Sequence, residues 1–266
     1  MSKNSESPLT GADTDDESPP VDGEALPRMT FLEHLEELRK RLTYSVIAIG
    51  VGFCLAWWKS KELFGWLARP LDQVLPEGQK SLTYLHPTDP FMLYMKVGLL
   101  GGIFIASPAV LYQVWKFISP GLYRKEKRMV FPFLFFTVLL FLTGGWFGYS
   151  YAYPAALKFL IGEMGSEFKS SITIENYFDL TSKIILGLGL VFEIPILIFF
   201  LARFGIVTPG FLMRNFRYAV LIIAILAAVL TPTPDMVNML MFMAPMVGLY
   251  LVGVLVAWLF GKPREA

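Results

Sequence analysis

Six long apolar segments, separated by polar or charged connections, are the feature that most restricts how this chain can fold. About 20 apolar residues cross the hydrocarbon core of a bilayer as a helix, and backbone that faces lipid must satisfy its own hydrogen bonds. A chain with 55% hydrophobic residues, 17% charged residues and a mean hydropathy of +0.53 has the composition of an integral membrane protein. We therefore predict an all-α integral membrane protein with six transmembrane helices, at residues 42–58, 91–117, 129–157, 180–204, 218–230 and 237–260.

The distribution of basic residues predicts the orientation of these helices. With the N-terminus inside, the segments on the cytoplasmic side hold 14 Lys and Arg residues and the outer loops hold 7. Because Lys and Arg are enriched on the cytoplasmic side of membrane proteins, this excess predicts that both termini are cytoplasmic. We divide the chain into a disordered acidic tail at 1–28, a six-helix membrane domain at 29–262 and a cytoplasmic tail at 263–266.

The connections between the apolar segments differ in length. Two outer loops are long, at 59–90 and 158–179, and the first carries a cluster of apolar residues that predicts a short helix on the outer surface. This cluster consists of Leu63, Phe64, Trp66 and Leu67. The third outer connection, Thr-Pro-Thr-Pro-Asp at 231–235, predicts a rigid turn. The fifth apolar segment is only about 20 Å long as a helix, which is shorter than a hydrocarbon core of about 30 Å.

The residues before the first apolar segment have the pattern of an amphipathic helix. Thr30 and Glu33 have the spacing of a capping box, in which each side chain satisfies a backbone amide of the first turn. Apolar residues recur at helical spacing at Phe31, Leu35, Leu38 and Leu42. Acidic residues at the start and basic residues at the end also suit the helix dipole. We predict a cytoplasmic amphipathic helix that runs directly into the first membrane span.

Two carboxylates on the predicted cytoplasmic side have two possible roles. Glu37 lies four residues before Arg41, a spacing that favours an ion pair on one helix. Glu126 is the only acidic residue in the loop Tyr-Arg-Lys-Glu-Lys-Arg at 123–128, where it could simply neutralise nearby charge. Both carboxylates nevertheless fall on one membrane face, where together they could bind two guanidinium groups through paired hydrogen bonds.

A third carboxylate, Glu193, lies alone in the apolar stretch 184–202. A charge within a membrane span costs on the order of a few kcal/mol, so such a residue normally faces a partner, a cavity or a proton path. Pro195 follows two residues later and is expected to kink the helix. These residues predict a polar, bent point inside the membrane.

Other polar and small residues within the spans suggest packing contacts. Lys96 either snorkels to the outer interface or pairs with an outer acid such as Asp89. Gly144 and Gly148, four residues apart, permit the close approach of another helix.

Five sequence motifs, in their order, are similar to those of one known family. The motifs are HLEELRKRL at 34–42, DPF at 89–91, SPAVLYQVWKFISPGLYRKEKR at 107–128, VFEIP at 191–195 and LTPTPD at 230–235. Over about residues 29–262 the chain resembles the TatC-type receptor subunit of the twin-arginine protein translocase. The resemblance implies a multi-pass protein of the bacterial inner membrane that binds signal peptides carrying two consecutive arginines. Together with small single-span TatA/TatB-type subunits, such a receptor exports folded proteins by using the proton motive force.

The resemblance also implies roles for particular residues. Glu37 and Glu126 correspond to the acids that receive the arginine pair, and Phe117 corresponds to the aromatic residue beside them. Residues implied to shape this site are Arg39, Pro108, Gln113, Tyr123 and Arg128. Phe192 and Glu193 match an intramembrane pair near the docking surface for partner helices. Outer-loop positions are Pro70 and Asp235, and on the sixth segment Met239, beside Asn238, stands where the family often has glutamine.

The sequence predicts a transport receptor rather than an enzyme, with no catalytic residue, cofactor or metal site and no nucleic-acid partner. Zinc-protease, nucleotide-binding and serine-nucleophile motifs are all absent from the sequence. The expected partners are twin-arginine signal peptides, TatA/TatB-type subunits, membrane lipid and further copies of the chain. The alternative is a proton-coupled secondary transporter with Glu193 as the titrating site, although the sequence has no internal repeat of the kind common in transporters.

Overall fold

The structure, a computed structural model, describes residues 31–74, 82–118, 130–163, 172–231 and 235–261. These residues are mainly helical and contain no β-strand beyond one isolated bridge between Thr83 and Thr173. The helices are α1 Phe31–Trp58, α2 Ser60–Val74, α3 Asp89–Ile118, α4 Val130–Phe147, α5 Tyr153–Leu157, α6 Ile174–Val191, α7 Ile194–Arg203, α8 Pro209–Arg214, α9 Phe216–Leu230 and α10 Met236–Phe260, with π-helical stretches η3 Gly148–Ala152 and η4 Lys158–Glu163 on either side of α5. The predicted all-α fold is confirmed.

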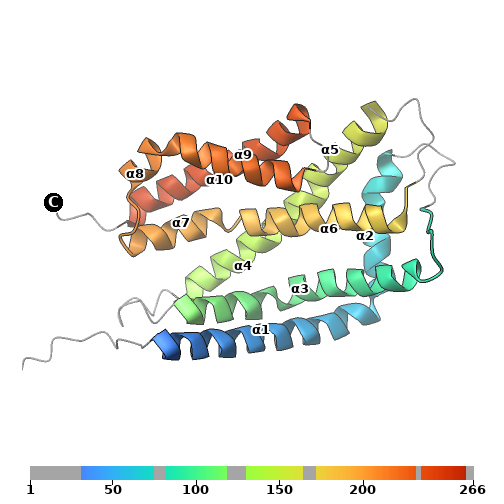
Figure 1. The fold of residues 1–266 in the computed structure, drawn as a ribbon, viewed down its shortest axis with the longest axis horizontal. Coiled ribbons are helices and arrows are strands. Elements are labelled where there is room, and N and C mark those ends of the chain that lie inside the picture. Colours follow the sequence, from blue (N-terminus) through green and yellow to red (C-terminus); the bar gives the residue numbers. More distant parts are fainter. Residues whose placement is uncertain (1–30, 75–81, 119–129, 164–171, 232–234, 262–266) are drawn as a thin grey trace, which may run out of the picture.

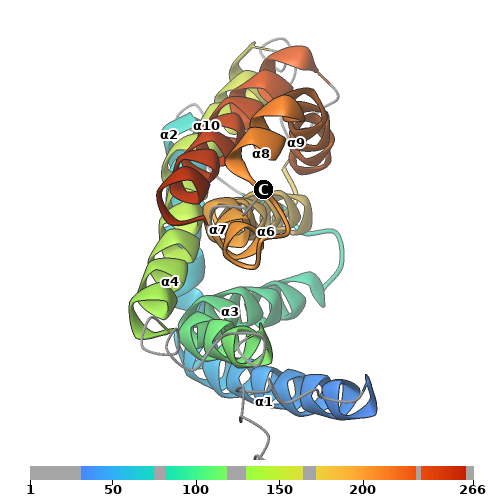
Figure 2. The same cartoon turned by 90° about the vertical axis from the view of Figure 1, so that its left-hand side faces the viewer.

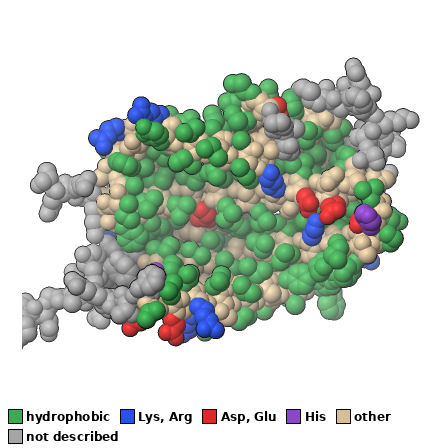
Figure 3. All heavy atoms as spheres, viewed as in Figure 1, with side chains coloured by type: hydrophobic (Ala, Val, Ile, Leu, Met, Phe, Trp, Pro, Cys, Tyr) green, Lys and Arg blue, Asp and Glu red, His purple; other side chains and the backbone are tan. Residues whose placement is uncertain are grey.

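Five helical stretches of the described chain are long and apolar enough to cross a membrane. They are Leu32–Trp58, Asp89–Ile118, Pro132–Ile161, Ile174–Arg203 and Met236–Phe260. The fifth predicted segment is also a helix, α9, but it has only 15 residues, which correspond to about 22 Å. Figure 3 shows that most charged side chains gather toward the two ends of the molecule and leave a largely apolar surface between them.

The long helices form a curved layer. In Figure 1, α1 and α3 lie side by side along one edge, α9 and α10 lie along the other, and α6 and α7 occupy the middle. The view along the helices in Figure 2 shows α4 joining the two edges. α2 runs across the ends of the long helices rather than along them.

Glycines bring α1 and α3 into backbone contact. A Cβ atom added at Gly52 would lie 2.5 Å from the carbonyl oxygen of Gly102, and one added at Gly102 would lie 2.6 Å from the amide nitrogen of Phe53. Small residues allow this approach because membrane helices associate mainly by close packing. The two helices are antiparallel, so the start of α1 lies beside the end of α3.

Glycines also bring α4 into contact with α6. A Cβ atom at Gly144 would lie 2.6 Å from the carbonyl oxygen of Leu188, and one at Gly148 would lie 3.2 Å from the Cα atom of Ile185. The close approach that the spacing of these glycines permits is therefore confirmed.

The predicted bend at Pro195 is a break between two helices. α6 ends at Val191, Phe192 and Glu193 form a turn, and α7 begins at Ile194 with Pro195 in its first turn. Proline suits this place because the first turn of a helix does not need its amide hydrogen.

The second outer loop is shorter than predicted. Helical turns continue to Glu163 and α6 already begins at Ile174, whereas the sequence placed a loop over 158–179. Thr173 caps α6 by accepting a hydrogen bond from the amide of Asn176. The prediction was wrong because the exposed polar residues of the first turns of α6 were assigned to the loop.

The predicted outer helix exists as α2 and is attached firmly to the bundle. The hydroxyl of Tyr149 donates to the carbonyl oxygen of Trp66, and that of Tyr177 donates to the carbonyl oxygen of Leu67, both at 2.7 Å. Leu67 and Pro70 are buried. α2 therefore packs against the ends of the spans and is more than a surface helix.

Several predictions concern residues outside the described ranges. They are the tails 1–28 and 263–266, the cap at Thr30, the prolines of the turn at 231–235, and the loop residues Tyr123, Glu126 and Arg128.

Candidate functional site

An arginine of α1 joins α1 to α3 near the predicted cytoplasmic end. Arg41 Nη2 donates a hydrogen bond to Glu37 Oε1 at 3.0 Å, and Arg41 Nη1 donates to Gln113 Oε1 at 3.4 Å. The side chains of Arg41 and Glu37 are only 20% and 14% exposed. This contact confirms the ion pair predicted from the spacing of four residues.

The two carboxylate oxygens of Glu37 differ in their contacts. Glu37 Oε2 is buried and accepts no hydrogen bond from any of the described residues. Because a carboxylate accepts up to four hydrogen bonds, Glu37 keeps most of its capacity despite the contact with Arg41. A buried carboxylate oxygen without a donor is costly, so a cationic donor is the ligand that suits this position.

An aromatic pair lies beside this carboxylate. The rings of His34 on α1 and Phe117 on α3 stack with their centroids 4.5 Å apart and an interplanar angle of 25°. His34 precedes Glu37 by three residues and Phe117 follows Gln113 by four, so each ring lies one helical turn from a polar residue of the site. The role of His34 was not predicted, although its helical spacing from Glu37 could have indicated it.

Two other predicted residues lie on the same helices without bonding to Glu37. The side chain of Arg39 is exposed, and its carbonyl oxygen accepts a hydrogen bond from the Thr43 hydroxyl at 2.8 Å. Pro108 is an exposed residue within α3. The described residues therefore bring together Glu37, Gln113 and Phe117, whereas the exposed Arg39 and Pro108 are not shown to contact them.

Glu193 lies in the turn between α6 and α7 and is 9% exposed. Its Oε1 atom is buried and has no hydrogen-bond partner among the described residues. The ring of Phe192 packs against that of Phe147, at a centroid distance of 5.6 Å, and lies over Gly144. The break between the helices thus places an aromatic residue against α4 and leaves one carboxylate oxygen of Glu193 without a donor from the described residues.

The polar residues at the start of α10 are joined by hydrogen bonds. Asp235 accepts hydrogen bonds from the amide nitrogen of Asn238 at 2.7 Å and from its Nδ2 atom at 3.0 Å. Asn238 is fully buried, whereas Met239 is partly buried against the core. Asn238 therefore contributes to the internal structure of the helix cap, and Met239 is the more accessible of the two side chains.

Glu193 and Asn238 lie at different depths. Gly253 of α10 packs against Ile198 of α7, and the two helices run in the same direction. Asn238 precedes Gly253 by fifteen residues, while Glu193 precedes Ile198 by only five. The difference of ten residues corresponds to about 15 Å along the helix axis, so these residues do not form one site.

Lys96 pairs with two acids of the segment predicted as the second outer loop, rather than with Asp89, which the sequence offered as an example. Lys96 Nζ lies 3.2 Å from Glu175 Oε1 and 3.0 Å from Asp179 Oδ1, and both acids belong to α6. Asp89 instead accepts hydrogen bonds from the backbone amides of Leu85 and His86. The predicted alternative of a pair with an acid of the outer segments is therefore confirmed, although both acids belong to a helix rather than to a loop.

Comparison with known proteins identifies the family. A profile described as Sec-independent protein translocase protein (TatC) matches residues 33–245. The Sec-independent protein translocase protein TatC of Koribacter versatilis is 52% identical over 250 residues, which cover 91% of this chain and 92% of that protein. That of Desulforapulum autotrophicum is 40% identical over 236 residues, which cover 89% of this chain and 87% of that protein.

A solved structure has the same fold. The crystal structure of a twin arginine translocase receptor, TatC, superposes with a TM-score of 0.75 at 35% identity and covers 85% of this chain and 99% of that one. A second crystal structure of such a receptor, in the detergent DDM, gives a TM-score of 0.76 at 33% identity, with coverage of 87% and 100%. The chain therefore belongs to the TatC family of Sec-independent protein translocase proteins, which are transport components rather than enzymes.

Proposed function

We propose that the chain is the receptor and core subunit of a twin-arginine translocase, and that Glu37 binds an arginine of the signal peptide. The observation that carries this proposal is the buried Oε2 atom of Glu37, which has no donor among the described residues. The guanidinium group of arginine presents donors in a planar fork that matches a carboxylate. A similar protein of known structure is described as a twin arginine translocase receptor.

The surroundings of Glu37 suit an arginine-bearing peptide. The stacked rings of Phe117 and His34 offer an apolar, aromatic surface one turn away, on which a guanidinium plane can rest. Gln113 already accepts a hydrogen bond from an arginine, so its position is compatible with a guanidinium ligand. In this proposal Glu126 receives the second arginine, and Arg39, Pro108, Tyr123 and Arg128 shape the margin of the site.

The proposed receptor crosses the bacterial inner membrane six times with both termini in the cytoplasm. The twofold excess of Lys and Arg in the cytoplasmic segments supports this orientation. In this arrangement α9 is the fifth span, and its length of about 22 Å requires a thinner bilayer or neighbouring helices around it. The Glu37 site then faces the compartment in which precursor proteins are made.

The proposed partners in the membrane are small single-span subunits of the TatA/TatB type and further copies of the chain. Glu193 supports this proposal because its buried Oε1 atom lacks a donor within the described part of the chain, and a polar group on a partner helix would supply one. The contact of Phe192 with α4 holds this turn in position. Met239, near the start of α10, offers an adaptable apolar contact at the end of the span opposite to the Glu37 site. Transport of folded proteins would use the proton motive force.

A photocrosslinking experiment tests the receptor function. Inverted membrane vesicles that contain the chain are incubated with a twin-arginine precursor carrying a photoreactive residue beside its arginines. We expect Glu37→Gln and Glu126→Gln each to abolish the crosslink, because each variant removes a charge that pairs with arginine. The matched control is Glu36→Gln, which removes an exposed charge from the same helix. Crosslinking that persists in both variants at the normal yield would refute the proposal.

A proton-coupled transporter is the competing function, and the structure offers it little support. Glu193 is the only acidic residue classed as buried in the described part of the chain, whereas proton relays usually combine several ionisable groups. Flux assays in proteoliposomes distinguish the two functions. Proton-coupled uptake of a small solute that is lost in Glu193→Gln would favour the transporter over the receptor.

A further inference from the structure

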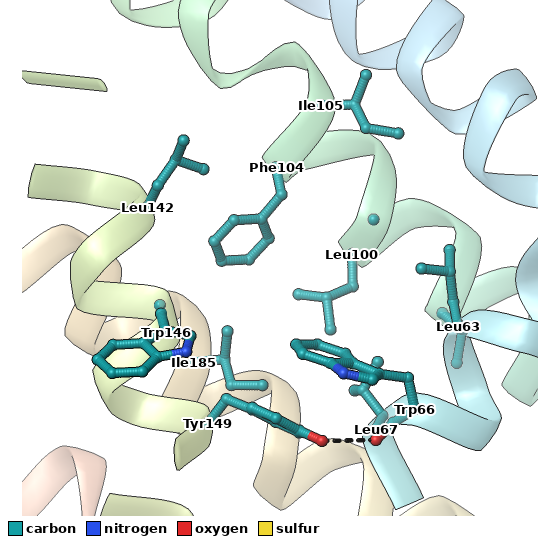
Figure 4. A pocket seen from close by; sticks show the side chains of 13 residues that line it. Leu63, Trp66, Leu67, Leu100, Phe104, Ile105, Leu142, Trp146, Tyr149 and Ile185 are labelled. Atoms are coloured by element: carbon teal, nitrogen blue, oxygen red, sulfur yellow. Dashed lines mark hydrogen bonds between the residues drawn. The ribbon is translucent and has the colours of Figure 1, made fainter. Parts of the chain in front are cut away.

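An apolar pocket of about 300 Å³ lies between α2, α3 and α4, away from both the Glu37 site and the turn at Glu193. Figure 4 shows the side chains that surround it, and those that define its shape are Trp66, Leu100, Phe104, Ile105, Trp146 and Tyr149. Its volume lies at the lower end of the range of about 300–1,000 Å³ that is typical of small-molecule sites. The lining extends along α3 from Val97 to Ile105, a distance of about 12 Å.

One end of the pocket is closed by an aromatic pair. The rings of Trp66 and Tyr149 stack with their centroids 4.0 Å apart and an interplanar angle of 21°. The hydroxyl of Tyr149 donates to the carbonyl oxygen of Trp66, so the polar atom of the tyrosine is satisfied within the protein. A ligand in the pocket therefore meets mainly carbon surface.

The other side of the pocket opens into the membrane. The rim residues Ile105 and Trp146 are largely exposed, and both lie within helices long enough to span the bilayer. Hydrocarbon, rather than water, is the solvent at this depth. A pocket of this kind is suited to a flexible apolar chain.

A basic residue of α2, Arg69, lies near the end of the pocket that Trp66 closes. Arg69 is exposed and follows Trp66 by three residues on α2, so it lies one helical turn from the tryptophan that closes the pocket. α2 is an amphipathic helix across the ends of the spans, so Arg69 lies at the depth of lipid headgroups. Arginine binds phosphate by paired, charge-assisted hydrogen bonds.

We propose that this pocket binds one acyl chain of a phospholipid from the leaflet on the side of α2, with Arg69 holding the phosphate of that lipid. The apolar lining accommodates the chain, the aromatic pair closes the end near α2, and the arginine complements the anionic headgroup. This lipid would brace α2 against α3 and α4. The proposal does not depend on signal-peptide binding.

Lipid photolabelling tests the proposal on the full chain. The protein is placed in phosphatidylcholine nanodiscs with a small fraction of phosphatidylglycerol that carries a diazirine in its acyl chain. After irradiation, labelled peptides are mapped by mass spectrometry. We expect labelling to concentrate on residues 100–105 and 142–149, compared with the equally lipid-facing stretch 251–255 of α10.

Two matched pairs of variants sharpen the test. Ile105→Trp fills the mouth of the pocket and should reduce labelling of 142–149 by roughly tenfold, the effect of losing about 1.4 kcal/mol of binding free energy. Its control is Leu99→Trp, because Leu99 is 46% exposed on the same helix, against 51% for Ile105, and does not line the pocket. Arg69→Gln should weaken labelling by phosphatidylglycerol, while its control Lys61→Gln, an exposed cation on the same helix, should not.

Three results would overturn the proposal. The first is uniform labelling of the apolar surface in the wild-type protein, which would indicate ordinary surrounding lipid. The second is labelling of the pocket that Ile105→Trp and Arg69→Gln both leave unchanged. The third is crosslinking of the rim residues to a partner helix in native membranes, which would show that protein rather than lipid fills the pocket. The wild-type map decides the question even if a variant fails to fold.

Discussion

Arg41 donates hydrogen bonds to Glu37 and Gln113 at once, so an arginine of the chain itself already occupies part of the proposed arginine site. This arrangement holds the carboxylate in place before a peptide arrives. An incoming arginine that pairs with both oxygens of Glu37 would share Oε1 with Arg41 or replace Arg41 there.

Arg41→Gln should therefore strengthen binding of a twin-arginine signal peptide. A hydrogen bond to a charged group contributes about 1.5–3 kcal/mol, and the variant removes the internal competitor for Glu37. We expect a Kd about tenfold lower, measured by fluorescence anisotropy of a labelled peptide in nanodiscs. Lys40→Gln, an equal change of charge at an exposed neighbour, is the control. Weaker binding by Arg41→Gln would mean that Arg41 orients Glu37 rather than competing for it.

Replacement of Gly102 by alanine should destabilise the contact between α1 and α3. In Gly102→Ala the new Cβ would lie 2.6 Å from the amide nitrogen of Phe53 and 2.8 Å from its Cα atom, so backbone must move. Overpacking of this kind costs about 1–3 kcal/mol. We expect a lower thermal unfolding temperature in detergent, together with weaker peptide binding because Glu37 and Gln113 separate.

Gly50→Ala is the matched control for this prediction, since its Cβ would have no neighbour within 4 Å. Alanine stabilises a helix interior by up to about 1 kcal/mol relative to glycine. The unfolding temperature of Gly50→Ala should stay the same or rise. Equal losses in the two variants would contradict the packing explanation.

Glu193→Leu should stabilise the isolated protein and impair transport. The variant removes a buried carboxylate oxygen that has no donor among the described residues, and leaving such a group unsatisfied costs about 1–3 kcal/mol. We expect a higher unfolding temperature in detergent but reduced crosslinking to the single-span partners. Glu193→Gln, which can still hydrogen-bond to a partner, should retain more of the crosslink. Normal transport by Glu193→Leu would exclude a role for this residue in partner binding.

The ion pairs of Lys96 should make a small, salt-dependent contribution to stability. Exposed ion pairs contribute about 0.2–1 kcal/mol each, and salt screens them. We expect Lys96→Gln to lower the unfolding temperature slightly at low ionic strength and to match the wild type at high ionic strength. A large, salt-independent loss would show that the aliphatic part of the lysine, rather than its charge, packs α3 against α6.

The helices and the break at Pro195 could be predicted because they depend on local properties. Runs of apolar residues specify spans, and a proline favours a kink or a break in a helix, although Pro108 lies within α3 without ending it. The boundary of the second outer loop could not be predicted in this way. The first turns of α6 alternate exposed Glu175 and Asp179 with buried Tyr177 and Phe178, so average polarity is a poor guide to helicity there.

The contacts between helices were harder to predict than the helices. Spacing on one helix predicted the ion pair of Glu37 with Arg41, but the bond of Arg41 to Gln113 joins residues 72 positions apart. It depends on the register of α1 against α3, which Gly52 and Gly102 set through backbone contact. The same reason applies to Lys96, because the choice among the acids of the outer segments depends on how α3 lies against α6.

Because α1 is a continuous helix, a change of tilt in its membrane part would also move its amphipathic start. α1 is one helix of 28 residues with no proline or break between its amphipathic start and its membrane part. Gly52 is the natural pivot, and Glu37 lies fifteen residues away, a lever arm of about 22 Å. A tilt of about 10° at this pivot displaces Glu37 by about 4 Å, more than the length of the hydrogen bonds that link it through Arg41 to α3. A tilt of this size would therefore break the contact between Arg41 and Gln113 that joins α1 to α3.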